Sequence, residues 1–116
     1  SFYNGGQNLA FGGAGNDYFN VYGTEATVEG GTGDDEILCT ADSSTLVYNG
    51  DLDEGSDTIF YFFVDTDTLQ VSDTTFDDLL IEKAGKNTRI SLSSGTEITL
   101  HRIVPDEVTQ DIFDFV

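Results

Sequence analysis

Two nine-residue segments built to one pattern constrain the fold of this chain more than any other feature. Residues 12–20 read GGAGNDYFN, and residues 30–38 read GGTGDDEIL. Each has glycine at positions one, two and four, aspartate at position six and a large apolar residue at position eight. The two segments begin 18 residues apart, which is the length of two nonapeptides. A short repeat of fixed period predicts a solenoid, in which each unit buries its apolar face against its neighbours.

The nonapeptides between and after these two keep the apolar position and lose the rest. Residues 21–29 and 39–47 have no glycine pair, but both have an apolar residue at position eight. A nonapeptide of this kind forms a six-residue turn and a three-residue strand, so two of them complete one coil with turns on opposite edges. Asp17 and Asp35 are therefore expected to lie above one another on one edge. The same place on the other edge, which we expect to bind no ion, holds Asn8, Ala26 and Ser44.

The charge of the chain restricts its partners. Twenty-two acidic residues against four basic residues give a formal net charge of −18, which disfavours nucleic acids and anionic membrane surfaces. With nine Phe and five Tyr, the chain is nevertheless too apolar for a solvated acidic tail. Cations must neutralise the carboxylates before the chain can collapse. Because the single Cys39 cannot form an intrachain disulfide, a metal ion is the leading candidate for a stabilising cross-link.

Calcium fits the chemistry of the glycine-rich turns. It takes about 6–8 oxygen ligands, and glycine lets the backbone turn its carbonyl groups towards an ion. Without an ion, two stacked carboxylates ~4 Å apart repel by roughly 4 kcal/mol at an effective dielectric of about 20, so folding and ion binding form one equilibrium. The residues predicted to surround calcium are Gly12, Ala14, Gly15, Asp17, Gly30, Thr32, Gly33, Asp35, Asp51, Asp53 and Asp57.

The sequence does not decide which aspartate comes next above Asp35 in this stack. Continuing the 18-residue spacing places Asp53 over Asp35, whereas residues 55–59 match the later part of a nonapeptide with Asp57 at position six. The second alignment requires a four-residue insertion. Either aspartate could complete a second site, with Asp51 beside it, and a solvated acidic turn is the alternative. An EF-hand loop is disfavoured because its twelfth position, which should be Glu, is Phe62.

The two intact motifs resemble the calcium-binding repeats of the repeats-in-toxin family. The match covers residues 12–38, with weaker similarity to about residue 60. The resemblance implies a parallel β-roll that binds Ca²⁺ and belongs to a bacterial protein exported to the extracellular medium. It also implies a C-terminal partner, the type I secretion machinery. Residues 113–116 are similar to the end of such regions and are expected to be an export signal, a last strand of the cap, or both.

We therefore predict an all-β chain that forms one structural unit. Residues 1–60 are expected to form a short right-handed parallel β-roll, and residues 61–116 an antiparallel β cap. The aromatic run at residues 60–63 is expected to cover the open end of the roll, with an exposed ligand-binding strip as the alternative. Strands beyond the roll are expected at residues 58–64, 68–72, 79–83, 89–93 and 97–101.

The expected function is that of a non-catalytic module. His101 has no second histidine at metal-ligand spacing, and no serine lies in a G-x-S-x-G motif. No run of about 20 apolar residues could span a membrane. The module is expected to fold on meeting extracellular calcium and so to support the secretion and folding of a parent protein. The alternative is a carbohydrate-binding or substrate-positioning module of a secreted polysaccharide-modifying enzyme or adhesin. For an anionic polymer the available cations are Lys83, Lys86, Arg89 and Arg102.

Overall fold

The chain folds into strands joined by short turns. The computed structural model describes residues 2–5 and 9–116, with side chains from residue 9 onward. Asn8, which the repeat pattern places on the edge expected to bind no ion, lies outside the described residues. The described strands are β1 (Phe2–Gly5), β2 (Leu9–Phe11), β3 (Tyr18–Val21), β4 (Glu25–Glu29), β5 (Glu36–Cys39), β6 (Ser43–Asn49), β7 (Ser56–Phe60), β8 (Thr68–Ser72), β9 (Leu80–Ala84), β10 (Asn87–Ser91), β11 (Glu97–Leu100) and β12 (Phe113–Phe115).

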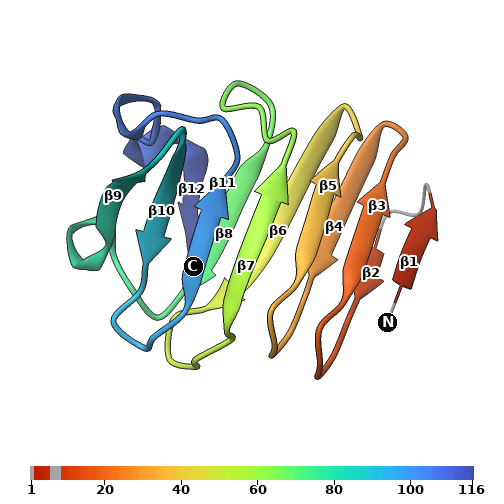
Figure 1. Ribbon diagram of the computed structural model, residues 1–116, viewed down its shortest axis with the longest axis horizontal. Helices are drawn as coiled ribbons and strands as arrows, with labels where there is room; N and C mark the ends of the chain where they lie inside the picture. The colour runs from red at the N-terminus through yellow and green to blue at the C-terminus, as the bar shows by residue number, and fades with distance from the viewer. Residues whose placement is uncertain (1, 6–8) are drawn as a thin grey trace.

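The strands form two facing sheets, and the chain alternates between them. One sheet has the order β1-β3-β5-β7-β11-β10-β9 and the other β12-β8-β6-β4-β2. Figure 1 shows the coils stacked side by side from the N-terminal end towards the C-terminal end. Strands β3 and β5 pair in parallel with Val21 opposite Cys39, which is the 18-residue period of the sequence. The prediction of an all-β parallel roll with further capping strands is confirmed.

The core lies between the two sheets because every second residue of a strand points inward. In β6 the burial alternates along the whole strand, and in β3 and β5 Phe19 and Ile37 are buried. Burying one such side chain contributes roughly 1.5–3 kcal/mol. The buried residues contributed by the roll are Ala10, Phe19, Val21, Ala26, Val28, Ile37, Cys39, Leu46, Tyr48, Ile59, Leu69 and Val71. Position eight of the nonapeptide therefore supplies the core, as the repeat pattern requires, together with the residue two places later, such as Val21 and Cys39.

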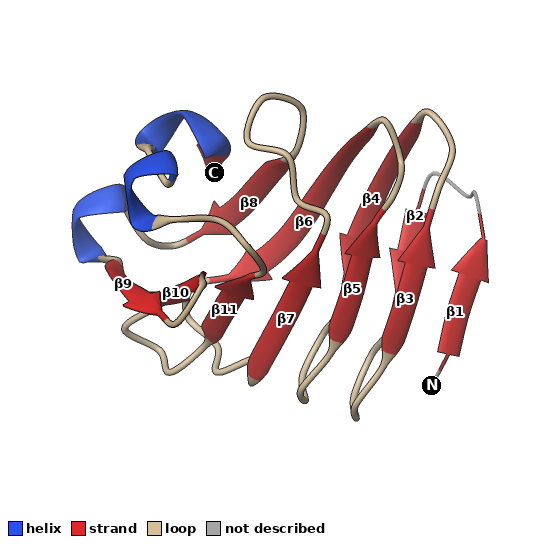
Figure 2. Cartoon of the chain, turned by 45° about the horizontal axis from the view of Figure 1, so that its top comes forward, coloured by secondary structure: helices blue, strands red, loops and turns tan. Residues whose placement is uncertain are grey.

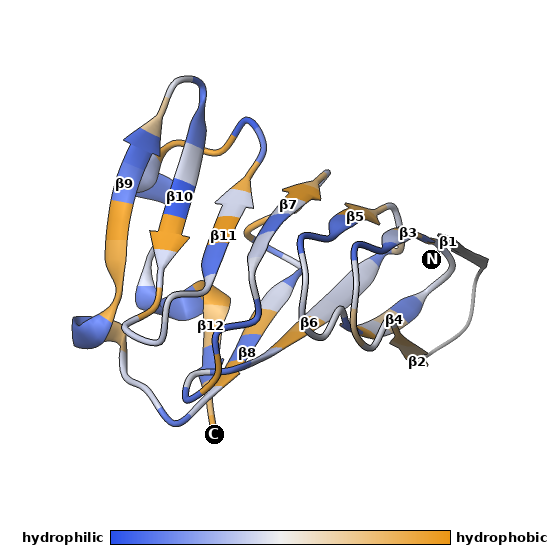
Figure 3. Ribbon diagram, turned by 60° about the horizontal axis from the view of Figure 1, so that its bottom comes forward, coloured by the Kyte–Doolittle hydropathy of each residue, from blue (hydrophilic) through white to orange (hydrophobic). Residues whose placement is uncertain are grey.

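Glycine is required where one turn lies on the next. Gly33 has φ of +103°, and a Cβ atom there would collide with the carbonyl oxygen of Gly15 in the preceding coil. Gly55 has φ of +90°, and a Cβ atom there would collide with the carbonyl oxygen of Gly33 in the same way. The turns can therefore stack closely only with glycine at these places. Figure 3 colours this edge pale to blue, whereas hydrophobic orange segments follow the strands.

Parallel pairing continues past residue 60. Strand β8 pairs in parallel with β6, β12 with β8, and β11 with β7. Only β9, β10 and β11 form the antiparallel meander among the described strands. The expectation of antiparallel strands throughout residues 61–116 is thus wrong for β8 and β12. They extend the second sheet because residues 67–69 repeat the aspartate and apolar positions of the motif. The division of the chain at residue 60 stays a prediction.

The C-terminal end of the roll is covered by short elements. The 3-10 helices η1 (Phe76–Asp78), η2 (Pro105–Glu107) and η3 (Gln110–Ile112) gather at this end, drawn as blue helices in Figure 2. The strand expected at residues 58–64 ends at Phe60, because Tyr61 takes φ of +62° and turns the chain. Among the described residues, none of the helices has the length and apolar character needed to cross a bilayer.

Candidate metal site

Three aspartates at position six of successive coils form a ladder along the glycine-rich edge. The backbone N–H of Asp17 donates to Oδ1 of Asp35 at 2.8 Å, and the N–H of Asp35 donates to Oδ1 of Asp57 at 2.9 Å. All three side chains are buried, with relative exposures of 5%, 1% and 0%. The structure therefore stacks Asp57, and not Asp53, over Asp35. The four-residue insertion is accommodated in the turn that precedes β7, since Ile37 pairs with Ile59.

A second ladder runs beside the first and was not expected from the sequence. The N–H of Asp34 donates to Oδ1 of Asn16 at 2.8 Å, and the N–H of Ser56 donates to Oδ1 of Asp34 at 2.9 Å. Position five holds Asn in one intact motif and Asp in the other, and this pair of polar side chains was the sequence signal for a second ladder. These side chains fix the spacing of adjacent turns and leave the position-six carboxylates facing the interior of the stack.

The position-six carboxylates meet backbone oxygens inside the turns. Oδ2 of Asp35 is buried and has no hydrogen-bond partner, and it lies 2.5 Å from where a Cβ atom of Gly30 would stand. A Cβ atom placed on Gly12 would lie 2.6 Å from the carbonyl oxygen of Gly30 and would also touch Oδ2 of Asp17. The donors gathered here are therefore all oxygens, which suit a hard cation such as Ca²⁺ and not the nitrogen and sulfur ligation of structural zinc.

Side chains alone do not complete a metal site at this edge. Within residues 9–116, no group of three or more His, Cys, Asp or Glu side chains is arranged to hold a metal ion. Any cation bound at the ladder must therefore draw on the carbonyl oxygens of the glycine turns. This matches the chemistry of calcium, which accepts carbonyl ligands together with carboxylates.

Two of the ladder carboxylates, Asp35 and Asp57, are hard to ionise in the absence of a cation. Burial is the main cause that raises the pKa of Asp35 from 3.8 to about 6, and the Asp17 carboxylate also acts to raise it, whereas the Asp17 amide acts to lower it. Burial raises the pKa of Asp57 from 3.8 to about 7, although the Asp35 amide and the Tyr48 hydroxyl both lower it. A cation beside these groups would favour their ionised forms, so the site is electrostatically suited to one.

Asp57 differs from Asp35 in having both oxygens satisfied. Its Oδ2 accepts a hydrogen bond of 2.9 Å from the hydroxyl of Tyr48, which reaches across the interior from β6. Its neighbour in the next strand is the apolar Ile98. The ladder thus ends at Asp57, whose Oδ2 accepts a hydrogen bond from a hydroxyl, whereas Oδ2 of Asp35 has no hydrogen-bond partner.

The remaining predicted ligands lie around the turns. Asp51 and Asp53 are exposed in the turn before β7, where the N–H of Gly55 donates to Oδ1 of Asp53 at 3.0 Å. Ala14 and Thr32 are exposed at equivalent places in their turns. The structure therefore separates Asp51 and Asp53 from the buried ladder. Sequence reasoning also missed Glu54 in this turn, which is buried and accepts the N–H of Asn49 at 2.8 Å.

The opposite edge has one ladder step of its own. Oδ1 of Asp67 accepts the N–H of Ser44 at 2.8 Å, and Oδ2 accepts the N–H of Phe63 at 2.8 Å. Both oxygens of this buried carboxylate are therefore used by amides. The aspartate and apolar residues of the Asp67–Leu69 segment were the sequence signal, but the five-residue lengthening of the preceding turn hid their register.

Comparison with known proteins identifies the fold. No model of a known protein family matches the chain, and no curated protein matches its sequence. The structure is similar to that of an extracellular lipase from Serratia marcescens, with a TM-score of 0.83 and 19% identity over 99% of this chain. The chain covers only 19% of the lipase. The fold belongs with the parallel β-rolls.

A second solved structure extends the comparison. The chain is similar to a subunit of the mannuronan C5-epimerase from Azotobacter vinelandii, with a TM-score of 0.66 and 18% identity. This alignment covers 99% of the chain and 92% of the epimerase subunit. The same fold therefore occurs both as a small part of a larger enzyme chain and as a separate subunit of similar extent.

Proposed function

We propose that this chain is a non-catalytic calcium-binding module of the repeats-in-toxin type. The observation that carries the proposal is the buried Oδ2 of Asp35, which has no hydrogen-bond partner beside the glycine turns. A buried carboxylate oxygen is costly unless something compensates it. Calcium would supply the missing positive charge and accept the surrounding carbonyl oxygens as further ligands. Asp17 and Asp35, with the turns at Gly12 and Gly30, would hold it.

The net charge explains why folding would depend on the ion. A formal charge of −18 opposes compaction, and the ladder brings carboxylates together in a poorly solvated place. An ion that binds only the folded chain adds about 2.7 kcal/mol when it exceeds its Kd a hundredfold. Asp35 in its ionised form would then stabilise the stack of coils instead of opposing it.

The proposed biological role follows from this dependence. In a cytosol poor in calcium the chain would remain unfolded and fit for export, and outside the cell it would fold. We propose that it serves in this way as part of a larger secreted bacterial protein, with type I secretion machinery acting on its C-terminal end. The fold it shares with a lipase that is described as extracellular supports this role.

The test compares two Asp→Asn variants that change the charge equally. In Asp35→Asn, the remaining oxygen can still accept the amide of Asp17, while the oxygen without a partner becomes an amide nitrogen. Asp51→Asn is the matched control because Asp51 is exposed. Far-UV circular dichroism is followed while calcium is added to protein first treated with EGTA.

The wild type is expected to lose β signal in EGTA and to regain it with a midpoint of about 10⁻⁴–10⁻³ M calcium. Asp35→Asn should raise the midpoint about tenfold, because it removes a ligand charge. Asp51→Asn should leave it within about twofold. A β spectrum and urea midpoint that are unchanged by EGTA, or equal calcium midpoints for the two variants, would overturn the proposal.

A further inference from the structure

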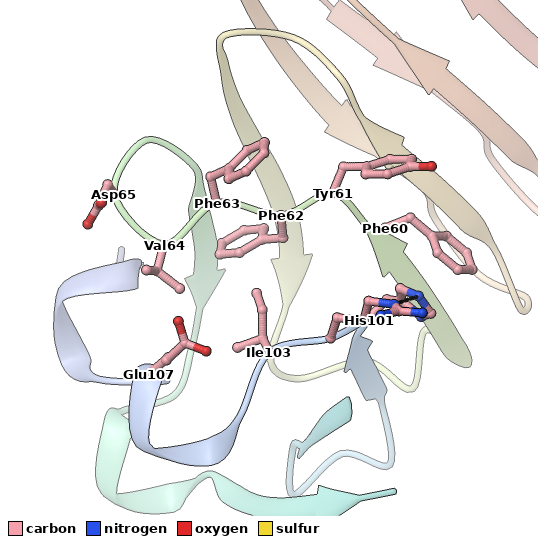
Figure 4. Close-up of a pocket in the computed structure, with 10 residues that line it drawn as sticks. Phe60, Tyr61, Phe62, Phe63, Val64, Asp65, His101, Ile103 and Glu107 are labelled. Atoms are coloured by element: carbon pink, nitrogen blue, oxygen red, sulfur yellow. Dashed lines mark hydrogen bonds between the residues drawn. The ribbon is translucent and has the colours of Figure 1, made fainter. Parts of the chain in front are cut away.

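A cleft of about 630 Å³ lies at the edge of the molecule opposite the glycine turns. It forms between the turn at residues 61–67, which follows β7, and residues 101–107, which follow β11. Because β7 and β11 are adjacent parallel strands, the segments that leave their ends lie next to each other. Figure 4 shows the aromatic side chains of residues 60–63 along one side, with Ile103 and Glu107 across from them.

Two large rings stand in solvent beside this cleft. Tyr61 is 58% exposed and Phe63 is 60% exposed, whereas Phe62 between them is buried in the core. Phe60 lies against His101 with ring centroids 4.8 Å apart. The predicted role of this aromatic run as core is therefore right for Phe62 and wrong for Tyr61 and Phe63, because the left-handed turn at Tyr61 redirects the chain outward.

The apolar surface continues onto the outer face of the first sheet. A second hollow of about 210 Å³ shares Phe60 and Tyr61 with the cleft and is also lined by Tyr18, Leu38 and the charged Glu36. Leu38 pairs with Phe60 in the neighbouring strand, so their outward side chains are aligned across the sheet. Together the two hollows reach from residues 101–107 across β7 and β5 to Tyr18 of β3, which suits a chain-like ligand more than a single small ring.

The cleft is held in a fixed shape by strained and buried residues. Tyr61 and Arg102, which line it, have φ of +62° and +59°. Side chains other than glycine in this region cost about 1–3 kcal/mol each and occur often at ligand sites. The N–H of Arg102 donates to Oδ1 of Asn87 at 3.0 Å, and Asp67 holds the N–H of Phe63. The backbone that carries Tyr61 and Phe63 is therefore held in place before any ligand arrives.

The polar groups of the cleft select the ligand class. His101 and Arg102 offer donors, while Asp65 and Glu107 offer carboxylate acceptors. Sugar hydroxyl groups both donate and accept hydrogen bonds, and the C–H faces of a sugar ring pack on aromatic side chains. The two carboxylates, together with the net charge of −18, disfavour an anionic polymer. Of the cations expected to serve such a polymer, Lys83, Lys86 and Arg89 lie on the β9–β10 hairpin and only Arg102 lines the cleft.

We propose that this cleft binds a neutral oligosaccharide, whose sugar rings pack on Tyr61 and Phe63. His101, Arg102 and Glu107 hydrogen-bond its hydroxyl groups. This function is independent of catalysis and goes beyond calcium-dependent folding, because the cleft lies on the edge away from the aspartate ladder.

The test is isothermal titration calorimetry on the full chain in millimolar calcium. The probes are cellohexaose, maltohexaose, mannohexaose and fully N-acetylated chitohexaose, with a galacturonate hexamer as the anionic comparison. The variants are Tyr61→Ala and Phe63→Ala, and Tyr22→Ala is the matched control. Tyr22 is 49% exposed and lies on the turn before β4, outside the cleft. Circular dichroism with calcium confirms that each variant is folded.

At least one neutral hexasaccharide is expected to bind in the millimolar range or tighter. Each cleft variant should weaken that binding about tenfold, because each removes one aromatic contact, while Tyr22→Ala should change it less than about twofold. The proposal is overturned if no neutral probe binds, if the galacturonate hexamer binds more tightly than all of them, or if folded Tyr61→Ala and Phe63→Ala bind like the wild type. A chain that folds with calcium but binds no sugar would refute this proposal and leave the calcium proposal standing.

Discussion

The stacking of the glycine turns can be tested by two alanine substitutions that differ in one contact. Gly15 and Gly33 occupy the same position in successive coils, with φ of +95° and +103°. A Cβ atom on Gly15 would have nothing within 4 Å, whereas one on Gly33 would collide with the carbonyl oxygen of Gly15. The backbone strain is thus nearly equal in the two variants, and the contact between coils is present in only one.

The magnitudes separate the two variants. Alanine at a left-handed position costs about 1–3 kcal/mol, and this cost is common to both. Gly33→Ala must also push the two turns apart, and overpacking of this kind costs about 1–3 kcal/mol more. Since domains have about 5–15 kcal/mol of stability in all, Gly33→Ala should lose a large share of it. Gly15→Ala should remain well folded.

The assay is urea unfolding in saturating calcium, followed by far-UV circular dichroism. Gly33→Ala should have the lower urea midpoint, and it should also need more calcium to fold because its turns are held apart at Gly15. Gly85→Ala is a further control, since Gly85 has φ of +65° in the β9–β10 turn and open space around it. Equal free energies of unfolding for Gly15→Ala and Gly33→Ala would refute the inference that coil contact requires glycine.

Three further outcomes follow from the buried groups. Because burial places the pKa of Asp35 at about 6 and of Asp57 at about 7, the folded chain without calcium binds more protons than the unfolded chain. The β signal of protein freed of calcium on a chelating resin should therefore be greatest near pH 4 and fall as the pH rises through 7, which far-UV circular dichroism measures. Cys39 is fully buried with a pKa raised to about 12 by burial, so iodoacetamide should label it slowly in calcium and rapidly in EGTA, as mass spectrometry would show. Tyr48→Phe removes the hydroxyl that donates to Asp57 and should cost about 1–3 kcal/mol in urea unfolding, with no loss if that hydrogen bond is unimportant.

The sequence predicted the parts of the fold that depend on periodicity. The 18-residue spacing placed Asp17 under Asp35 correctly, because each coil needs the same number of residues to cross both sheets. It could not choose between Asp53 and Asp57, since a turn can absorb four extra residues without disturbing either strand. The choice depends on the pairing of Ile37 with Ile59, which buries both side chains. Residues 55–59 carried a local signal for the Asp57 alignment, but only this tertiary contact decides between the two alignments.

Other features depend on contacts between distant segments and were hidden for that reason. The hydrogen bond from Tyr48 to Asp57 crosses the interior between two sheets, and a tyrosine at an inward position otherwise predicts only core. Tyr61 was expected to continue a strand, because an aromatic residue favours extended backbone. Its left-handed conformation is imposed by the turn that Asp67 closes through the N–H of Phe63. The preference of Tyr61 for extended backbone was thus overruled by the turn that the buried Asp67 carboxylate forms with the N–H of Phe63.

If the proposed calcium dependence holds, the end of the aspartate ladder explains how an ion-dependent roll can join an ion-independent cap. At Asp35 the second carboxylate oxygen has no hydrogen-bond partner, and in the proposed function a cation compensates it. At Asp57 the same oxygen is satisfied by Tyr48, and the next strand presents Ile98. Along the successive strands, the proposed ion at Asp35 is thus followed by the Tyr48 hydroxyl at Asp57 and then by the apolar side chain of Ile98. The need for calcium should accordingly be greatest in the coils nearest the N-terminal end, and the strands around Ile98 should provide the surface on which those coils assemble.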